Sequence, residues 1–173
     1  IDGLRVQART TNGGFIKACN EGAAEARGEI MVSLNNDTVP QPGWLHALLA
    51  TFEAQPDAGL VGAKLLYPDG RLQEAGGVVF DDGSAWNYGR FESPEDPRYA
   101  SLREADYCSG AAIMVSTALF RDLGGFDARY APAYYEDTDL AFAVRARGLR
   151  VLYQPAARVG QGVPVSYPHL TPP

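Results

Sequence analysis

Along the first 66 residues, the pattern of apolar and polar positions predicts helices and buried strands that follow one another alternately. Small and apolar residues recur at helical spacing from Gly14 to Arg27, and the uncharged run from Ile30 to Leu34 is typical of a strand covered on both faces. A second helical pattern begins near Gly43 and ends before Pro56, and Gly59 to Leu66 predicts another buried strand. The apolar positions of this second helix are Leu45, Leu48, Leu49 and Phe52. The alternation predicts an α/β fold with a mixed, mainly parallel sheet flanked by helices.

The rest of the chain has shorter elements joined by turns. Pro68-Asp69-Gly70 and the segment from Asp81 to Ser84 are turn signals that separate extended segments. Residues 84 to 106 are the least regular part and are rich in aromatic residues, proline, glutamate and arginine. The remaining predicted elements are strands at Gly76–Phe80, Ala111–Val115 and Val151–Tyr153, a helix that Ser116 caps and that ends at Leu123, and a helix over Asp139–Arg147.

Length, charge and cysteine content exclude several function classes. A chain of 173 residues fits one domain, and its 15 Lys and Arg against 21 Asp and Glu give a net charge of −6. Because no cluster of basic residues is longer than a pair, we expect no nucleic-acid partner. Apolar runs stay far below the ~20 residues of a membrane span. The two cysteines, Cys19 and Cys108, are too few for a disulfide framework and are typical of a reducing compartment.

The first candidate for chemistry is Asn35-Asn36-Asp37, directly after the predicted strand that ends at Leu34. In open α/β sheets, ligands bind beyond the carboxyl ends of strands. A carboxylate with amide oxygens beside it suits Mg²⁺ or Mn²⁺, which keep coordination positions for phosphate oxygens. The same residues are ordinary turn formers ahead of Pro40, so a simple turn is an equal alternative.

The second candidate is the acidic segment Glu136-Asp137-Thr138-Asp139, which follows two tyrosines. Three carboxylates in four residues repel one another unless cations or a helix N-terminus offset their charge. In one interpretation Asp137 caps the helix and Asp139 lies in its first turn. In the other, one of these carboxylates is a general base that stays ionised at neutral pH.

Two weaker candidates lie between these segments. Ser109-Gly110 is a pair of small residues that would let a backbone approach a ligand closely, although the start of a buried strand has the same composition. Trp86 belongs to the irregular aromatic segment, whose rings either stack on a sugar or cover the core. A Cys–His mechanism is not expected, because His46 lies within an amphipathic helix and His169 in the proline-rich C-terminal segment.

Taken in order, these segments resemble the family 2 glycosyltransferases of the GT-A fold. The resemblance covers about residues 10 to 158, and its specificity lies in the order of the motifs. The run from Tyr67 to Cys108 looks most like bacterial members that build O-antigen or other surface polysaccharides. The matching segments are Asn12 to Phe15, Ala18 to Gly22, Gly28 to Thr38, Pro42 to Leu45, Val61 to Leu65, Cys108 to Ala111, Gly124 to Asp127, and Glu136 to Leu140 with Arg145.

The resemblance implies an inverting transfer of a sugar from a UDP- or dTDP-sugar to a hydroxyl of a saccharide or glycolipid. Asp37 matches the family's metal-binding carboxylate and would hold Mg²⁺ or Mn²⁺. Asp137 matches the catalytic base, although Glu136 could instead be the base, with Asp137 capping the helix. The implied donor- and phosphate-binding residues are Asn12, Gly14, Asn35, Asn36 and Asp37, and the implied acceptor- or sugar-binding residues are Trp86, Ser109, Gly110 and Tyr135.

Three departures from the family pattern limit what we expect of this chain. The family's first strands, which hold the nucleotide base, have no counterpart before Asn12. A histidine that many relatives place after the strand ending near Val159 is absent, and the proline-rich segment that follows matches nothing in the family. We therefore expect a partial GT-A catalytic domain over residues 1–159, with its first strands missing, and a tail outside the domain over residues 160–173.

The departures also affect the expected activity and location. We expect the fragment alone to be inactive, although the whole enzyme would be active. The resemblance implies a cytoplasmic protein, with peripheral association at the inner face of the plasma membrane as an alternative that would use segments outside this chain. A domain that kept the fold and binds a sugar or nucleotide without catalysis is the alternative function.

Overall fold

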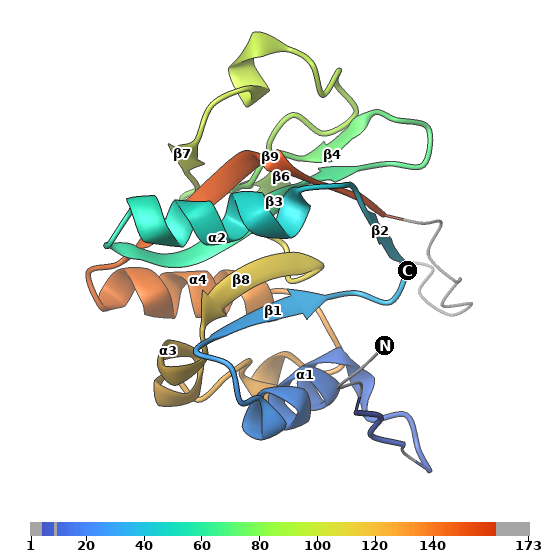
Figure 1. The fold of residues 1–173 in the computed structure, drawn as a ribbon, viewed down its shortest axis with the longest axis vertical. Coiled ribbons are helices and arrows are strands. Elements are labelled where there is room, and N and C mark those ends of the chain that lie inside the picture. The colour runs from blue at the N-terminus through green and yellow to red at the C-terminus, as the bar shows by residue number, and fades with distance from the viewer. Residues whose placement is uncertain (1–4, 9, 162–173) are drawn as a thin grey trace.

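The computed structural model describes residues 5–8 and 10–161 of the chain (Figure 1). In these residues helices and strands alternate first, and shorter elements follow. In chain order the elements are α1 (Gly14–Glu25), β1 (Ile30–Leu34), β2 (Thr38–Pro40), α2 (Trp44–Ala54), β3 (Ala58–Leu66), β4 (Leu72–Glu74), β5 (Gly77–Val79), β6 (Ala85–Asn87), η1 (Pro97–Tyr99), β7 (Arg103–Glu104), β8 (Ala112–Ser116), α3 (Thr117–Asp122), η2 (Ala128–Tyr130), α4 (Glu136–Ala146) and β9 (Arg150–Gln161).

The main sheet has the strand order β1-β8-β3-β9-β2, with β4 paired to β3 and β7 paired to β9. β3 and β9 are parallel, and β1 runs in the same direction because β8, between β1 and β3, is antiparallel to both. The mixed α/β fold is therefore confirmed. Among the described strand pairs only β3–β9 is parallel, so antiparallel pairing is more frequent than the sequence predicted. The reason is that the chain leaves β3 and enters β8 at the same end of the sheet, which needs no crossover connection.

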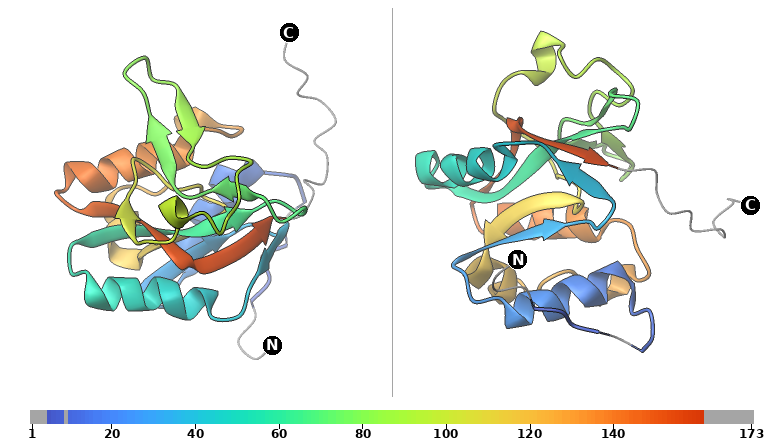
Figure 2. Two further views of the ribbon diagram at one scale, coloured as in Figure 1. Left: turned by 90° about the horizontal axis from the view of Figure 1, so that it is seen from above. Right: turned by 45° about the vertical axis from the view of Figure 1, so that its right-hand side comes forward.

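Helices cover both faces of this sheet (Figure 2). On one face, residues of α1, α3 and α4 pack against Leu60, Ile113 and Val151. On the other face, Leu48 of α2 packs against residues that alternate with these, including Val61 and Leu152. All residues of β3 are buried, as a strand between two layers requires. The predicted sandwich of helices around a sheet is thus present, with its core in two layers.

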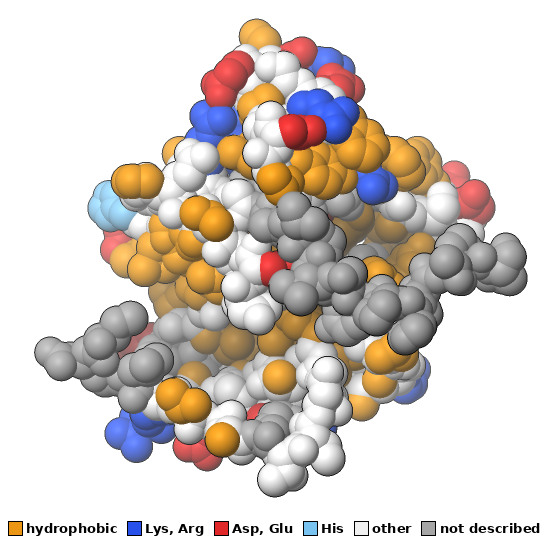
Figure 3. Space-filling view, turned by 90° about the vertical axis from the view of Figure 1, so that its right-hand side faces the viewer, with side chains coloured by type: hydrophobic (Ala, Val, Ile, Leu, Met, Phe, Trp, Pro, Cys, Tyr) orange, Lys and Arg blue, Asp and Glu red, His pale blue; other side chains and the backbone are white. Residues whose placement is uncertain are grey.

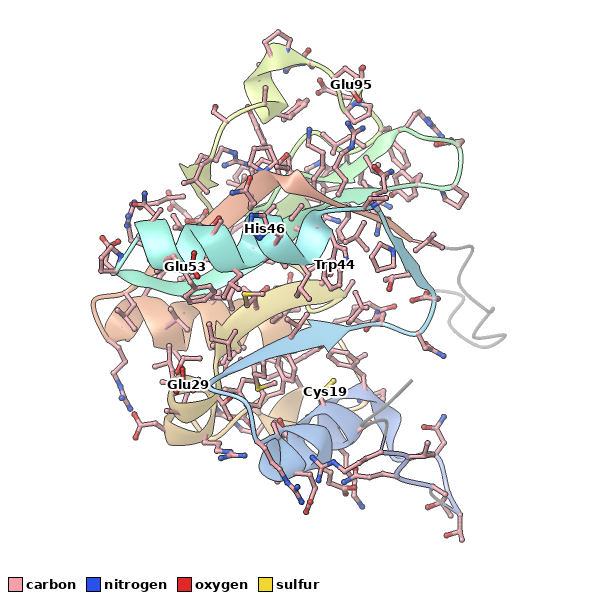
Figure 4. The ribbon with its side chains drawn as sticks, viewed as in Figure 1. Cys19, Glu29, Trp44, His46, Glu53 and Glu95 are labelled. Atoms are coloured by element: carbon pink, nitrogen blue, oxygen red, sulfur yellow. The ribbon has the colours of Figure 1, made fainter. Side chains whose placement is uncertain are left out.

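Helices α2 and α4 each differ from the prediction in one respect. On α2, Leu48 is buried but Leu45 and Leu49 are exposed, so the face that meets the sheet is rotated from the predicted one. Trp44, Ala47 and Phe52 complete the buried face, and they too have helical spacing. Helix α4 begins at Glu136 and not at Asp139, because the acidic segment itself forms the first turn. His46 is exposed on α2 (Figure 4).

Strand β1 has the predicted bounds but not the predicted burial. Four of its residues are half-buried or exposed and only Ser33 is buried. The physical reason is its position at the end of the strand order, where its one described neighbour is β8. A strand at the edge of a sheet is covered less completely than a central strand.

The shorter predicted elements are largely confirmed. Ser116 caps α3 by accepting the amide N–H of Leu119 at 3.3 Å. The turn at residues 68–70 is closed by the Gly70 amide on the Tyr67 carbonyl at 2.9 Å, and residues 81–84 form the turn of the β5–β6 hairpin. The irregular segment contains β6, η1 and β7. Strand β9 extends to Gln161, past the expected domain boundary at residue 159, and the rest of the expected tail lies outside the described residues.

One very close approach within the core is at Gly62, in the middle of β3. A Cβ atom at this position would lie 2.2 Å from Cβ and 2.5 Å from Sγ of Cys108, and both residues are buried. We expect Gly62→Ala to lower the free energy of unfolding by about 1–3 kcal/mol, because no space is left for the added methyl group. Urea denaturation measures the change.

Gly22 is the matched control, since a Cβ atom there would meet nothing within 4 Å and the residue lies inside α1. Gly22→Ala should raise the free energy of unfolding by about 0.5–1 kcal/mol, because alanine favours a helix interior. If Gly62→Ala were as well tolerated as Gly22→Ala, the close approach of β3 to Cys108 would be disproved.

Candidate active site

The turn after β1 places Asn35, Asn36 and Asp37 at the carboxyl end of that strand. Thr38 closes the turn with two bonds to the Asn35 carbonyl, from its amide at 3.2 Å and from its hydroxyl at 2.6 Å. The turn that these residues predicted is therefore present. Asn36 is exposed, whereas Asp37 is half-buried and its Oδ1 is buried without a hydrogen-bond partner in the described part of the chain. An unpaired buried carboxylate oxygen is costly, so a cation at this position would be favourable.

Ser109 and Gly110 lie beside this turn, just before β8. The connection is a hydrogen bond from the Asn35 amide to the carbonyl of Ala111 at 3.0 Å. A Cβ atom at Gly110 would lie 3.2 Å from the ring of Phe15 and 3.6 Å from Cβ of Asp137. The small residues do allow a close approach, as predicted, but in the structure the groups that approach are side chains of α1 and α4.

The carboxylate of Asp137 accepts three hydrogen bonds, one of them from the Ser109–Gly110 segment. Its Oδ2 accepts the Gly110 amide at 3.0 Å, and its Oδ1 accepts the amide of Thr138 at 2.7 Å and the Thr138 hydroxyl at 3.3 Å. Burial raises the pKa of Asp137, and these bonds, which favour the carboxylate, oppose the rise. The interpretation of Asp137 as the helix cap is wrong, because α4 begins at Glu136 and the cap position belongs to Tyr135. The carboxylate is thus oriented by the Gly110 backbone and not by a capping role.

Glu136, the other candidate base, is more deeply buried. It is 7% exposed, and its Oε2 has no hydrogen-bond partner among the described residues. Burial raises the pKa of Glu136, and the negative charge of Asp137 adds to the rise. Burial raises the pKa of the Cys19 thiol on α1, and the negative charge of Glu136 adds to this rise, so the two groups lie near each other. Figure 4 shows Cys19 on α1 beneath β1.

The start of α1 lies against the loop that leads to α4. Asn12 is exposed, and its Oδ1 accepts the Gly14 amide at 2.9 Å, which forms a turn before the helix. Gly14 has a positive φ of 76°, and a Cβ atom there would lie 3.7 Å from the Pro132 carbonyl. The structure therefore brings these two predicted donor-binding residues to the α4 loop, and their described contacts are local.

Tyr134 and Tyr135 both have left-handed backbone conformations, with φ of 86° and 71°. Such conformations are strained for residues other than glycine and are frequent at functional sites. The Tyr135 hydroxyl donates to the Gly83 carbonyl at 3.4 Å, so the tip of the β5–β6 hairpin lies beside the start of α4. Trp86, on the same hairpin, is half exposed and has the Arg90 guanidinium 5.3 Å from its ring centroid. Tyr135 is thus next to the acidic segment, and Trp86 lies beside Arg90 and opposite Val78 of β5.

Glu74 is a residue of this region that sequence reasoning missed. It ends β4, it is fully buried, and its Oε1 accepts the Ser109 amide at 2.8 Å. Burial raises the pKa of Glu74 to about 8; the Ser109 bond lowers it and the charge of Asp137 raises it further. Glu74 lies in the segment Leu72 to Gly77. The sequence feature that could have pointed to it was a single carboxylate among mostly small and apolar residues.

Cavity volume does not single out this site. Two cavities of about 440 and 530 Å³ in the described part lie elsewhere, the first around Arg103 and Arg145, the second at the start of α2 around Trp44. Neither is lined by Asp37, Ser109 or Asp137. Hydrogen bonding and charge, rather than concavity, therefore identify the candidate site, which Figure 3 views from the end of the sheet where β1 finishes.

The donor set at this site fits a divalent cation that receives most of its ligands from a bound phosphate. Within the described residues there is no group of three or more His, Cys, Asp or Glu side chains that could hold a metal ion. Asp37 supplies one unpartnered carboxylate oxygen, and Asn35 and Asn36 stand next to it. Mg²⁺ and Mn²⁺ are bound in this manner when substrate phosphates complete the coordination.

Comparison of the sequence with known families and proteins agrees with this chemistry. The family model described as "Glycosyl transferase family 2" matches residues 1–122. The "O-antigen biosynthesis protein RfbC" of Myxococcus xanthus is 34% identical over 140 residues, which are 77% of this chain and 11% of that protein. The "N-acetylglucosaminyl-diphospho-decaprenol L-rhamnosyltransferase" of Mycobacterium tuberculosis is 29% identical over 140 residues, which are 75% of this chain and 45% of that protein. The chain thus spans less than half the length of both relatives.

Solved structures show the same fold. The structure titled "GalNAc-T7 with UDP, GalNAc and Mn2+" superposes with a TM-score of 0.74 at 17% identity, over 98% of this chain and 34% of that chain. The mannosyltransferase PcManGT from Pyrobaculum calidifontis, in complex with GDP-Man and Mn²⁺, has a TM-score of 0.61 at 20% identity, over 91% of this chain and 39% of that chain. The fold is therefore the GT-A glycosyltransferase fold. A search of the described helices found none with the length and hydrophobicity to cross a bilayer.

The buried Glu74 gives the stability of the fold a pH dependence. Its pKa is about 8 in the folded chain, above the usual value of 4.5, so folding favours the protonated form. The stability that Glu74 contributes is full below about pH 4.5 and is lost as the pH rises through about 8. Relative to Glu74→Gln, which cannot ionise, wild type should lose up to about 1.4 kcal/mol per pH unit across this window. Urea denaturation at several pH values measures the difference, and parallel curves for the two proteins would rule out a raised pKa.

Proposed function

The chain belongs to glycosyl transferase family 2, and we propose that its site transfers a sugar from a nucleotide-sugar donor to an acceptor hydroxyl, with inversion at the anomeric carbon and with Asp137 as the general base. The observation that carries this proposal is the position of the Asp137 carboxylate. It is fixed on the Gly110 amide, in a segment hydrogen-bonded to the turn that holds Asp37. A base and a phosphate-side carboxylate from two different elements thus lie at one end of the sheet.

The environment of Asp137 suits a base better than that of Glu136. Asp137 is half-buried and keeps two oriented oxygens, whereas Glu136 is 7% exposed and lies near Cys19. A raised pKa makes a carboxylate a stronger base, and the amide bonds favour its ionised form. Activity should therefore fall as the pH drops through the pKa of Asp137, which lies above that of an ordinary aspartate.

In the proposed step, the acceptor oxygen attacks the anomeric carbon from the face opposite the diphosphate. The new bond between carbon and acceptor oxygen forms as the bond between that carbon and the diphosphate oxygen breaks. The electron pair of the broken bond leaves with the nucleoside diphosphate, and Asp137 takes the proton of the acceptor hydroxyl. Positive charge on the sugar ring is greatest midway, as in glycoside hydrolysis. Solvent then removes the proton from Asp137.

Asp37 is the group that would hold a divalent cation. A bound Mg²⁺ or Mn²⁺ supplies Lewis-acid stabilisation of the charge on the leaving diphosphate. The Oδ1 of Asp37, which has no partner among the described residues, supports this role, and both similar structures are complexes with Mn²⁺. Asn35 and Asn36, in the same turn, would orient the diphosphate.

We propose a saccharide or a lipid-linked saccharide as acceptor and a UDP- or dTDP-sugar as donor. The support comes from the names of the relatives, one in O-antigen biosynthesis and one that transfers rhamnose to a diphospho-decaprenol-linked sugar. Such donors are water-soluble and such acceptors are presented at a membrane surface, so we also propose a cytoplasmic location or the inner face of the plasma membrane.

Asp137→Asn tests the base. In the natural protein that contains this sequence, the variant should lose about 10²–10⁴-fold in turnover, because a general base contributes that factor. Binding of the nucleotide-sugar donor, measured by isothermal titration with UDP- and dTDP-sugars in the presence of Mn²⁺, should not change. Near-wild-type turnover would reject Asp137 as the base.

Glu136→Gln is the matched control, because it removes the neighbouring carboxylate from the same helical turn. It should keep most of the activity if Asp137 is the base. The reverse ranking of the two variants would assign the base to Glu136. Donor binding without turnover in the wild-type protein would instead favour a non-catalytic sugar- or nucleotide-binding domain.

Asp37→Ala tests the metal site. In the presence of Mn²⁺ the variant should bind UDP or dTDP more weakly than wild type, by about tenfold or more, because one charged ligand corresponds to at least about 1.4 kcal/mol. Without Mn²⁺ the two proteins should bind these nucleotides equally. Asn36→Ala, on the exposed position of the same turn, is the control for disruption of the turn. Equal affinities of wild type and Asp37→Ala in Mn²⁺ would remove Asp37 from the metal site.

A further inference from the structure

Two consecutive backbone amides connect two carboxyl groups from different elements. The Ser109 amide donates to Oε1 of Glu74, on β4, at 2.8 Å, and the Gly110 amide donates to Oδ2 of Asp137, on α4, at 3.0 Å. Only one peptide unit separates the two donors. A displacement of Ser109 therefore changes the direction of the Gly110 N–H and, with it, the position of the Asp137 carboxylate.

Packing alone does not explain a glutamate at this position. Glu74 is fully buried beside apolar neighbours such as Leu72 and Ala75, which are fully buried as well. Its Oε2 is buried with no hydrogen-bond partner in the described residues. Burial of an incompletely satisfied carboxyl costs stability that an apolar residue of similar size would not. Among the described residues, the hydrogen bond from the Ser109 amide is a contact that an apolar side chain could not make.

We propose that Glu74 is a positioning residue for the catalytic base: by holding the Ser109 amide, it fixes the Ser109–Gly110 backbone that orients the carboxylate of Asp137. The inference rests on the proposed function, in which Asp137 is the base. It extends that function to Glu74, a fully buried residue of β4 that is bonded to the same backbone segment. Glu74 makes no described contact with Asp37 or with the turn after β1.

The charges around Glu74 are compatible with this role. The charge of Asp137 on α4 raises the pKa of Glu74, and the charge of Arg103 on β7 lowers it. A charge on Glu74 would in turn raise the pKa values of Tyr107, Cys108 and Tyr153. Burial raises the pKa of Glu74 to about 8, so its neutral form is favoured at neutral pH and it adds little negative charge beside Asp137. Glu74 can therefore hold Ser109 without opposing the ionisation of the base. Through Oε1 it accepts the amide in either protonation state.

Nuclear magnetic resonance of the isotope-labelled 173-residue chain tests the connection without need of turnover. Two quantities are measured: hydrogen exchange at the Ser109 and Gly110 amides, and the pH titration of the Asp137 carboxyl carbon. Glu74→Ala should speed exchange at both amides by about tenfold, which corresponds to loss of one hydrogen bond. It should also raise the titration midpoint of Asp137, because the Gly110 bond that favours the carboxylate is weakened.

Glu74→Gln should restore wild-type behaviour in both measurements, since its amide oxygen can accept the Ser109 N–H. Leu72→Ala is the matched control for a cavity in the same strand, because Leu72 is also fully buried but is not bonded to Ser109 through its side chain. It should speed exchange only as far as the whole chain is destabilised, and it should leave the Asp137 midpoint unchanged. The same midpoint change in Leu72→Ala as in Glu74→Ala would show a structural role only.

A measurement on wild type keeps the test decisive if Glu74→Ala does not fold. The Ser109 amide signal should follow the titration of the Glu74 carboxyl carbon, and this response should vanish in Glu74→Gln. A Ser109 signal that is independent of Glu74, or a Glu74→Gln protein with an altered Asp137 midpoint, overturns the proposal. Loss of turnover in Asp137→Asn is a separate measurement, so failure of the proposed base and failure of the Glu74 connection are distinguishable.

Discussion

Complete burial of β3 is the constraint from which the position of the site follows. Every residue from Ala58 to Leu66 is buried, so both faces of the strand need a helical layer and both edges need a neighbouring strand. Gly59, near the start of β3, leaves room for Val144 near the end of α4, because a Cβ atom there would lie 2.4 Å from the Val144 side chain. Helix α4 therefore begins at the opposite end of β3. The acidic first turn of α4 and the start of β8 meet at that end.

At this end of the sheet, the free-energy cost of burying a carboxyl group is offset differently for each of three acids. Asp137 is half-buried and compensated by amide and hydroxyl donors, so it can stay charged. Glu74 accepts a hydrogen bond from the Ser109 amide and is fully buried, so its neutral form is favoured. Asp37 keeps one buried oxygen without a partner in the described part of the chain. The result is one carboxyl group whose charged form is compensated by donors, one whose neutral form is favoured and one oxygen with capacity for a cation.

Features with a local cause were predictable from the sequence, and those that depend on tertiary contacts were not. The Ser116 cap and the hairpin turn at 81–84 follow from side chains next to the backbone that they bind. The face of α2 was predicted only in part. Leu48 and Phe52 pack in the core as expected. Leu45 and Leu49 do not, because two apolar stripes on that helix have helical spacing and only contact with the sheet selects one of them. The start of α4 was misplaced because capping and first-turn acids have the same composition. Glu74 was missed because no local pattern reveals that a lone acid will be buried.

The segment before β8 shows why packing and chemistry cannot be separated at this site. Gly110 is small because Phe15 and Asp137 both approach it, and its amide is the donor that orients the Asp137 carboxylate. The chain reaches this arrangement through two consecutive left-handed tyrosines, each of which costs about 1–3 kcal/mol. Burial of Leu140 and Val144 along α4 offsets that cost, because each fully buried aliphatic side chain contributes about 1.5–3 kcal/mol. The core contacts of α4 therefore stabilise a strained helix start, and that helix start delivers the carboxylate to the Gly110 amide.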